Sequence, residues 1–367
     1  MRKGLLKFSF RLIFIGLISS CNVLSSSDEA VYMAFEDVEY VSSFPVEVKL
    51  NSPEEPSIDY IGLREVRIVG NLLILGQANS NGLWQIYRLP DYEYLGGFLK
   101  RGDGPLEFMQ GPSLLNKLNF ENENGQLVVY IYDFQKGRVM KFNLSESLET
   151  GKEVLSPLES KVPPFLFSFT KVDQDVYLIK EIKDRDTRQV RSLVNSGNIS
   201  SLSVTAPLDN AAIKQGEDFN ILSALLEYNS ALDRVVEAPI GLNHINIYSL
   251  KGDFSKSICL EDKLSDIVKI QSQFRFNRNY TFADLRLFDE FFGVIFINED
   301  ELTYQNVRKK IPSILFFDYD GRPLAKIQTG SHFTSFDIDF NNQKLYTFDV
   351  HSDEFLKFDI KEVLEQM

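Results

Sequence analysis

A repeated run of short β-rich segments constrains the fold of this chain most strongly. Past residue 40 no long window has helical periodicity, whereas β-rich runs separated by Gly, Asn, Asp or Pro recur every 8 to 12 residues. At spacings of 52 to 61 residues, six units begin near Ile58, Ser113, Phe165, Asn220, Thr281 and Phe333. This spacing fits a four-stranded blade with its loops. The sequence therefore predicts an all-β fold, a six-bladed β-propeller of four-stranded antiparallel blades.

The second unit shows the expected strand order most clearly. Its predicted strands span residues 114–120, 126–134, 138–144 and 152–155. Within it, residues 129–133 end in Asp and are followed by a tight turn and by residues 138–142, which close on Phe. The last unit repeats this order in residues 345–349 and 355–359. The pattern is similar to the blades of NHL and YWTD propellers.

The last unit ends after three strands, because only residues 360–367 remain. Residues 44–50 alternate apolar and polar side chains and have no unit of their own. We expect them to supply the fourth strand of the last blade, so that an N-terminal strand closes the ring and removes an exposed sheet edge. Residues 261–280 and 298–310 interrupt the repeat and are predicted loop insertions on one face, the first with a short helix over 265–271.

The N-terminus has the pattern of an export signal. Basic residues precede an apolar run at residues 12–18, which is too short to span a bilayer as a mature helix. The following Ile-Ser-Ser-Cys resembles a bacterial lipobox, with Cys21 as the lipidated residue, and ordinary secretory cleavage is the alternative. We expect a signal peptide over 1–20, a lipidated Cys and flexible tether over 21–40, and the propeller over 41–367. The predicted location is the outer membrane, on the periplasmic face or the cell surface.

A glycine-rich stretch follows the first unit and carries a resemblance to a known family. Residues 100–108 read Lys-Arg-Gly-Asp-Gly-Pro-Leu-Glu-Phe. They resemble the Gly-x-Gly-Pro-Gly-Glu-Phe connector of TolB-like six-bladed propeller lipoproteins, with Leu106 in place of the third glycine. The lipobox and the six units extend the likeness over nearly the whole chain. This resemblance implies a fold and an envelope location more than an activity.

The same connector contains the best candidates for a ligand site. Arg101, Asp103 and Glu107 are predicted to present charged groups to one face of the ring, while the neighbouring glycines permit positive φ. The alternative is a structural turn between blades, in which Glu107 and Arg101 bond to neighbouring backbone. Trp84 lies beside the Asn-Ser-Asn-Gly turn at 79–82 and is a candidate for stacking on a sugar, with a core position as the alternative.

The sequence offers no catalytic constellation. Its three histidines lie in no recognised catalytic or zinc motif, and its acidic turns lack the spacing of a calcium loop. We therefore predict no catalytic residue, no metal site and no cofactor. The net charge is −13, and removal of the four basic residues of the leader would make it −17. An acidic chain repels polyanions, so nucleic acid is not an expected partner.

These observations favour a noncatalytic binding or scaffold propeller on an envelope lipoprotein. We expect it to engage a protein or a glycan through one face, with the membrane contacted only through the N-terminal lipid anchor. The alternative is a carbohydrate- or lactone-directed hydrolase or lyase with its site at the central channel. That alternative requires histidines or carboxylates converging at the channel mouth. A third possibility is a structural role in an envelope complex.

Overall fold

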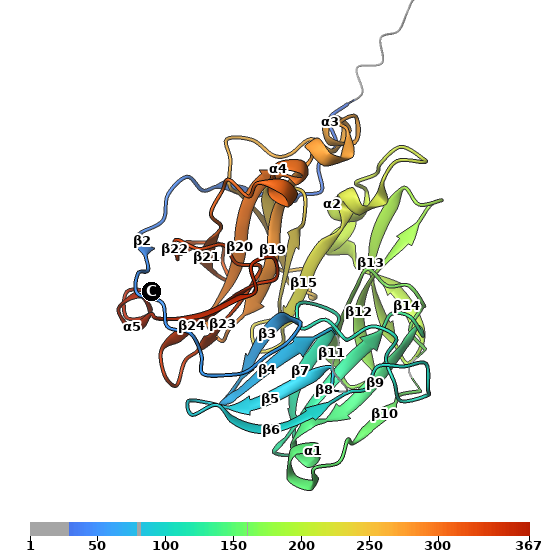
Figure 1. The fold of residues 1–367 in the computed structure, drawn as a ribbon. Helices are drawn as coiled ribbons and strands as arrows, with labels where there is room; N and C mark the ends of the chain where they lie inside the picture. Colours follow the sequence, from blue (N-terminus) through green and yellow to red (C-terminus); the bar gives the residue numbers. More distant parts are fainter. Residues whose placement is uncertain (1–28, 79–81, 160) are drawn as a thin grey trace, which may run out of the picture.

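The computed structural model describes residues 29–78, 82–159 and 161–367. In these residues six sheets are arranged in a ring, which confirms the predicted β-propeller (Figure 1). The first strand of each sheet begins within five residues of the predicted start of its unit. The β-branched and aromatic runs form the strands because their alternating side chains pack on the adjacent blades.

The blades follow one another along the chain, each a meander from its innermost strand outward. Blades one and two contain β3 (Leu63–Val69), β4 (Leu72–Gln77), β5 (Trp84–Arg88), β6 (Glu93–Phe98), β7 (Leu118–Glu123), β8 (Gln126–Asp133), β9 (Arg138–Asn143) and β10 (Leu155–Pro157). Blades three and four contain β11 (Ser168–Asp173), β12 (Val176–Lys183), β13 (Arg188–Asn195), β14 (Asn198–Ser201), β15 (Ala224–Asn229), β16 (Arg234–Pro239), β17 (His244–Tyr248) and β18 (Ser255–Cys259). Blades five and six contain β19 (Asn279–Leu287), β20 (Phe291–Asp300), β21 (Ser313–Asp318), β22 (Pro323–Gln328), β23 (Ser335–Asp339), β24 (Lys344–Asp349) and β25 (Glu354–Asp359).

The N-terminal segment adds two strands, and neither joins blade six. Strand β1 (Val38–Tyr40) pairs in parallel with β18 of blade four, and β2 (Val46–Lys49) pairs in parallel with β22 of blade five. The partner predicted for residues 44–50 is therefore wrong. A parallel strand needs no hairpin, so this segment covers the open edge of blade five before the chain reaches blade one. Blade six keeps three strands, and its outer strand receives only an isolated bridge between Glu54 and Lys357.

The ring closes by direct contact between the first and last blades. Strands β23 and β24 pack against β3. The backbone N–H of Val66 donates to Oγ of Ser335 over 3.2 Å, and that of Ile68 donates to a carboxylate oxygen of Asp337 over 2.8 Å. Side-chain oxygens of blade six therefore join the first and last blades. An N-terminal strand added to blade six was expected to join them.

The described part of the predicted tether is packed on blade four. From residue 29 onward, the backbone N–H of Val31 bonds to Asp266 over 3.3 Å, and Met33 is fully buried. The predicted propeller domain therefore receives contacts from residues before 41. Cys21 and the leader lie outside the described residues.

The helices are short and lie in loops: α1 (Leu144–Thr150), α2 (Ala206–Asp209), α3 (Ile267–Gln271), α4 (Glu301–Asn306) and α5 (Lys361–Leu364), with 3-10 turns at Ser203–Thr205, Phe219–Leu222 and Arg275–Asn277. Helices α3 and α4 fall in the two predicted insertions, and the predicted helix at 265–271 is confirmed. Each begins after an Asp whose carboxylate accepts from the first turn: Asp266 from Val268, and Asp300 from Thr303.

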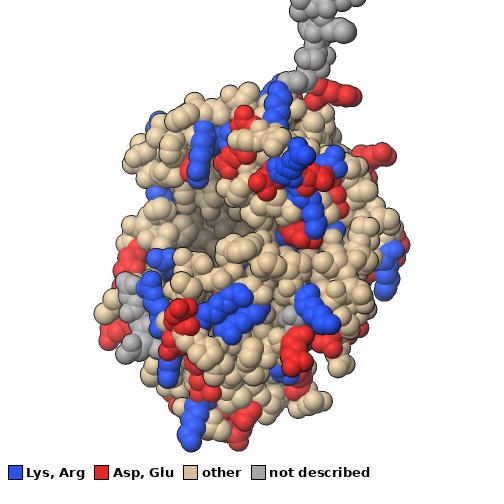
Figure 2. Space-filling view, turned by 90° about the vertical axis from the view of Figure 1, so that its right-hand side faces the viewer, with Lys and Arg blue, Asp and Glu red and all other residues tan. Residues whose placement is uncertain are grey.

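Strand direction distinguishes the two faces of the ring. Because strands alternate in direction, the connector that enters a blade lies at the same edge as the turn between its second and third strands. We call this edge the connector face. It carries α2, α3 and α4, while α1 lies between the third and fourth strands at the opposite edge, and Figure 1 separates α1 from the other three. In Figure 2 one side of the molecule is hollowed, with Lys and Arg side chains at the rim of the hollow.

Candidate functional site

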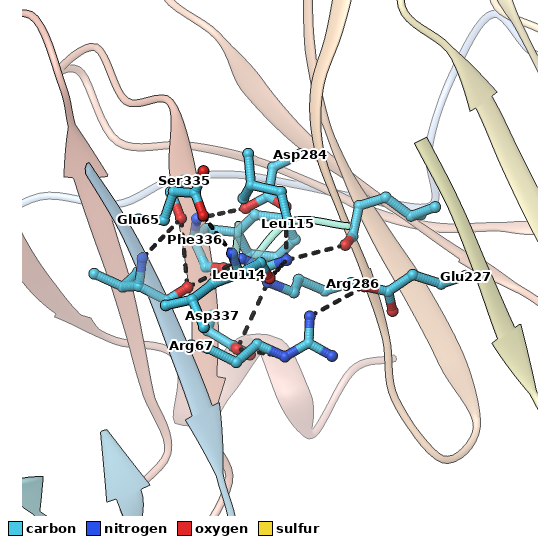
Figure 3. Close-up of polar contacts among 12 residues, drawn as sticks. Glu65, Arg67, Leu114, Leu115, Glu227, Asp284, Arg286, Ser335, Phe336 and Asp337 are labelled. Atoms are coloured by element: carbon cyan, nitrogen blue, oxygen red, sulfur yellow. Dashed lines mark hydrogen bonds and ion pairs between the residues drawn. The ribbon is translucent and has the colours of Figure 1, made fainter. Parts of the chain in front are cut away.

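A buried ion-pair cluster joins the innermost strands (Figure 3). Arg286 on β19 is fully buried and donates to the carbonyl oxygens of Phe336 (3.1 Å), Leu114 (3.2 Å) and Val66 (3.0 Å). Its Nη1 lies 2.9 Å from Oδ1 of Asp284, whose other oxygen accepts from the N–H of Phe336 over 3.0 Å. One side chain of blade five therefore ties together blade one, blade six and the connector to blade two.

The other carboxylates of this cluster are also engaged. Asp337 accepts from the N–H groups of Ile68 and Ile338, both over 2.8 Å, and lies 3.7 Å from Nε of Arg67. Arg67 of blade one in turn donates to Glu227 of blade four over 3.1 Å. The cluster thus spans the centre of the ring.

Burial changes the charge state of these acids. It raises the pKa of Asp284 to about 7, although Arg286 opposes the rise. Burial also raises the pKa of Asp337 and of Glu65, and the hydroxyl of Ser113 donates to Glu65 over 3.0 Å. Each of these carboxylates accepts from backbone, Ser or Arg groups, and the centre thereby holds the blades together.

The histidines do not contact the central acids. His244 on β17 lies under the N-terminal segment, with Nε2 2.7 Å from the carbonyl oxygen of Met33, and burial lowers its pKa to about 4. His332 contacts a backbone carbonyl of the loop after α4 over 2.8 Å. His351 packs edge-on to the ring of Tyr304. Among the described residues no histidine converges with the central carboxylates, and the hydrolase or lyase alternative is not favoured.

A second buried ionic cluster lies between blades three and four. Glu237 accepts from Nζ of Lys180 over 2.7 Å and from Nε of Arg191 over 2.9 Å, and all three side chains are fully buried. Burial alone would raise the pKa of Glu237, but Arg191 and Lys180 lower it to about 2. Arg191 also pairs with Asp209 over 2.9 Å. These groups neutralise one another away from solvent, so their role is structural.

The predicted connector residues are placed at the edge of blade two. Arg101 is exposed and donates to the carbonyl oxygen of Ala78 over 3.1 Å, and Asp103 is exposed. Lys136, in the second-to-third-strand turn of blade two, donates to the carbonyl oxygens of Gly104 (2.6 Å) and Glu107 (2.8 Å). The connector is therefore tied to the turn beside it, as the structural alternative expects.

Glu107 points into its own turn. Its Oε2 accepts from the N–H of Gly104 over 2.9 Å. A Cβ at Gly102 would lie 2.0 Å from this oxygen, and one at Gly104 would lie 2.9 Å from it. Neither glycine has a positive φ. The expected reason for these glycines is thus corrected: they leave room for the carboxylate, and Glu107 faces the backbone and not a ligand.

Trp84 lies in the core between blades one and two. It is fully buried, its ring packs against Phe120 and Phe142, and its Nε1 donates to the carbonyl oxygen of Pro112 over 3.3 Å. A sugar requires an exposed ring face, so this burial removes Trp84 from the candidate ligand-binding residues. The core alternative describes its position.

A cleft on the connector face separates blade one from blade two at this point. It consists of two adjoining cavities, of about 440 and 180 Å³, which share residues 110–113. The larger cavity is lined by Arg64, Glu65 and Arg101, and so extends from the central cluster to the connector. The smaller one is bounded by the blade-two strand β8 and its following turn. Arg101 is the one predicted site residue that lines this cleft.

The smaller cavity contains polar side chains that have no hydrogen-bond partner among the described residues. Lys117 lines it, and its amine makes no hydrogen bond or ion pair with the described residues; Nζ lies 4.4 Å from the centre of the Phe134 ring. Burial lowers the pKa of Lys117 to about 8. The side-chain amides of Gln110, Asn116 and Gln135 also line the cavity and form no hydrogen bond with the described residues.

Exposed aromatic rings stand beside this cavity. Phe134 is 37% exposed and Phe165 is 64% exposed, and their rings pack edge-on with centroids 5.8 Å apart. Two apolar connector residues, Leu106 and Met109, are also exposed. A cavity with uncommitted amides, one amine and an aromatic rim can bind a ligand, because such sites combine apolar contact with a few directed polar groups.

The described residues contain no cluster of three or more metal-ligating side chains. Within the same residues, no helix is long and apolar enough to cross a membrane.

Comparison with known proteins extends the fold assignment only. No family model and no curated protein matches the chain. Among solved structures, a member of the DUF4221 family from Bacteroides vulgatus has a TM-score of 0.51 at 10% identity, over 86% of this chain and 97% of that one. A putative exported protein from Bacteroides fragilis has a TM-score of 0.46 at 12% identity, over 85% and 87%. At this low identity, the match to the DUF4221 member shows a shared fold alone.

Proposed function

We propose that this chain is a noncatalytic binding propeller of the bacterial envelope, which engages a glycan or a protein through the cleft between blades one and two. The observation that carries the proposal is the contrast between the two polar regions. The central carboxylates are all engaged by backbone, Ser and Arg donors. The cleft instead holds an amine and three amides without partners among the described residues.

The position of the cleft supports the same function. It opens on the connector face, where loops vary without disturbing the sheets. The exposed rings of Phe134 and Phe165 provide a contact surface at its rim. The sequence adds the location: the leader and Cys21 support a TolB-like lipoprotein anchored to the outer membrane, which would hold the ring beside the envelope.

An unbiased glycan array and an affinity capture of envelope proteins, both with the purified protein, test the proposal. Phe134→Ala removes an exposed ring at the cleft, and Phe340→Ala removes a similarly exposed ring, 46% exposed, that packs with Phe288 and Phe291 of blade five. We expect a saturable ligand whose binding is weakened by Phe134→Ala and unchanged by Phe340→Ala. Equal binding by both variants would contradict the placement of the ligand in the cleft. Reproducible turnover would contradict the noncatalytic assignment.

A further inference from the structure

Three cations that line the cleft have no ion-pair partner among the described residues. Arg64, Arg101 and Lys117 line the two cavities, and none of them forms an ion pair within 4 Å among the described residues. By comparison, Lys141 and Lys171 on the opposite edge of blades two and three pair with glutamates over 2.7 and 2.6 Å. On a chain with net charge −13, three unpaired cations around one cleft form a local site for negative charge.

The described acids that line the cleft form no ion pair with these three cations. Glu65 accepts from Ser113 and from the N–H of Leu114. Asp133 accepts from the N–H of Lys136 over 3.3 Å and lies 3.5 Å from Nε of Arg138. Glu65 and Oδ1 of Asp133 are therefore directed to donors of the fold, while Oδ2 of Asp133 makes no hydrogen bond with the described residues and faces Nε of Arg138.

The backbone of Lys117 is fixed by the fold. It has a positive φ of 61°, a conformation that a residue with a side chain rarely adopts, and its carbonyl oxygen accepts from the N–H of Tyr132 over 2.9 Å. The amine lies in the cavity over the Phe134 ring. This cation–π contact offsets part of the free energy that the amine loses on leaving water. An ammonium without a counter-ion in a partly dry cavity is costly, and the lowered pKa of Lys117 agrees with that cost.

The neighbours of Lys117 indicate the rest of the ligand. The amides of Gln110, Asn116 and Gln135 each offer donors and an acceptor, which suits hydroxyl groups that also donate and accept. The exposed ring of Phe134 provides apolar surface, as the C–H face of a sugar ring requires. We propose that the cleft binds a saccharide that carries a carboxylate, and that the Lys117 amine pairs with this carboxylate. This inference rests on the proposed function and specifies its ligand.

Two matched saccharides test the pairing: an oligosaccharide that contains glucuronic acid, and the same oligosaccharide with its carboxyl groups reduced to alcohols. Calorimetry compares their binding to the wild type, Lys117→Gln, Lys117→Arg and Lys251→Gln, the last an exposed lysine on blade four. We expect the wild type to bind the acidic form about tenfold more tightly or better, because a charged hydrogen bond in a desolvated site is worth that much. Lys117→Gln should abolish the preference, Lys117→Arg should retain most of it, and Lys251→Gln should leave it unchanged.

The outcomes separate this inference from the proposed function. Equal binding of both saccharides, still sensitive to Phe134→Ala, overturns the carboxylate pairing and leaves the cleft as a binding site. Capture of a protein that is sensitive to Phe134→Ala, without binding of any saccharide, overturns the saccharide assignment alone. If no ligand of any kind is sensitive to Phe134→Ala, both proposals fail. Thermal unfolding of each variant establishes that the loss of binding is not loss of the fold.

Discussion

Replacement of Glu237 by Gln tests how the ionic interior stabilises the ring. Glu237 lies on β16 and is the shared acceptor of Lys180 and Arg191, which come from the neighbouring blade. The Gln side chain keeps the shape of the Glu side chain but removes its charge. Lys180 then loses its only ion-pair partner among the described residues, while Arg191 keeps Asp209.

The expected loss of unfolding free energy follows from the pKa of Glu237. A fall from 4.5 to about 2 corresponds to about 3 kcal/mol of stabilisation of the charged form at neutral pH. Removal of one partner from a buried pair has a cost of about 3–5 kcal/mol, so the two arguments agree. Because the pKa is lower in the folded protein, this stabilisation is present above pH 4.5 and is lost as pH falls through about 2.

Urea unfolding of the wild type and Glu237→Gln at about pH 7 and about pH 3 measures both effects. We expect a loss of about 3–5 kcal/mol at the higher pH and a smaller loss at the lower pH. Glu93→Gln is the control. The side chains of Glu93 and its partner Arg88 are 58% and 50% exposed, so they form a surface ion pair. A loss at Glu237→Gln no larger than at Glu93→Gln, or a loss independent of pH, would refute this account.

Three further changes test other parts of the structure. Because burial raises the pKa of Asp284 from 3.8 to about 7, its contribution to stability is full below pH 3.8 and is lost as pH rises to about 7. Asp284→Asn should therefore flatten the pH dependence of urea stability between about pH 4 and 7, and an unchanged profile contradicts the assignment. Trp84→Ala should cost about 3–5 kcal/mol in the same assay without altering ligand preference, because Trp84 is buried core. Gly102→Ala should displace Glu107 and lower stability by about 1 kcal/mol, and a neutral result by thermal unfolding would show that the turn tolerates a Cβ.

The sequence predicted the ring because its information is local. Each blade is a meander whose alternation and turns lie within about 50 residues, so the second and third strands of blade two and the helix at 265–271 could be located. The fourth strand, predicted at 152–155, lies at Leu155–Pro157 because helix α1 precedes it. The partner of residues 44–50 could not be located in this way. Their alternation fits the edge of any blade, and the choice of β22 depends on where the chain runs between blade four and blade one.

The candidate site was predicted less well for the same reason. The connector was identified by its glycines, but the direction of Glu107 depends on the N–H of Gly104, which only the folded turn places beside it. Lys117 and Phe134 have no sequence signal, since an isolated Lys before a strand and a Phe after one are common on surfaces. Their importance comes from the cavity that the two blades leave between them. The one available hint was the expected turn after Asp133.

Binding of a ligand in the cleft between blades one and two can be measured directly. The most direct measurement is a calorimetric titration of the strongest array ligand into the wild type, Phe134→Ala and Phe340→Ala. The account predicts that Phe134→Ala weakens binding about tenfold or more, as an aromatic contact at a binding centre does, while Phe340→Ala binds as the wild type. Wild-type affinity in Phe134→Ala, with the protein folded, would contradict the claim and place the binding surface elsewhere on the ring.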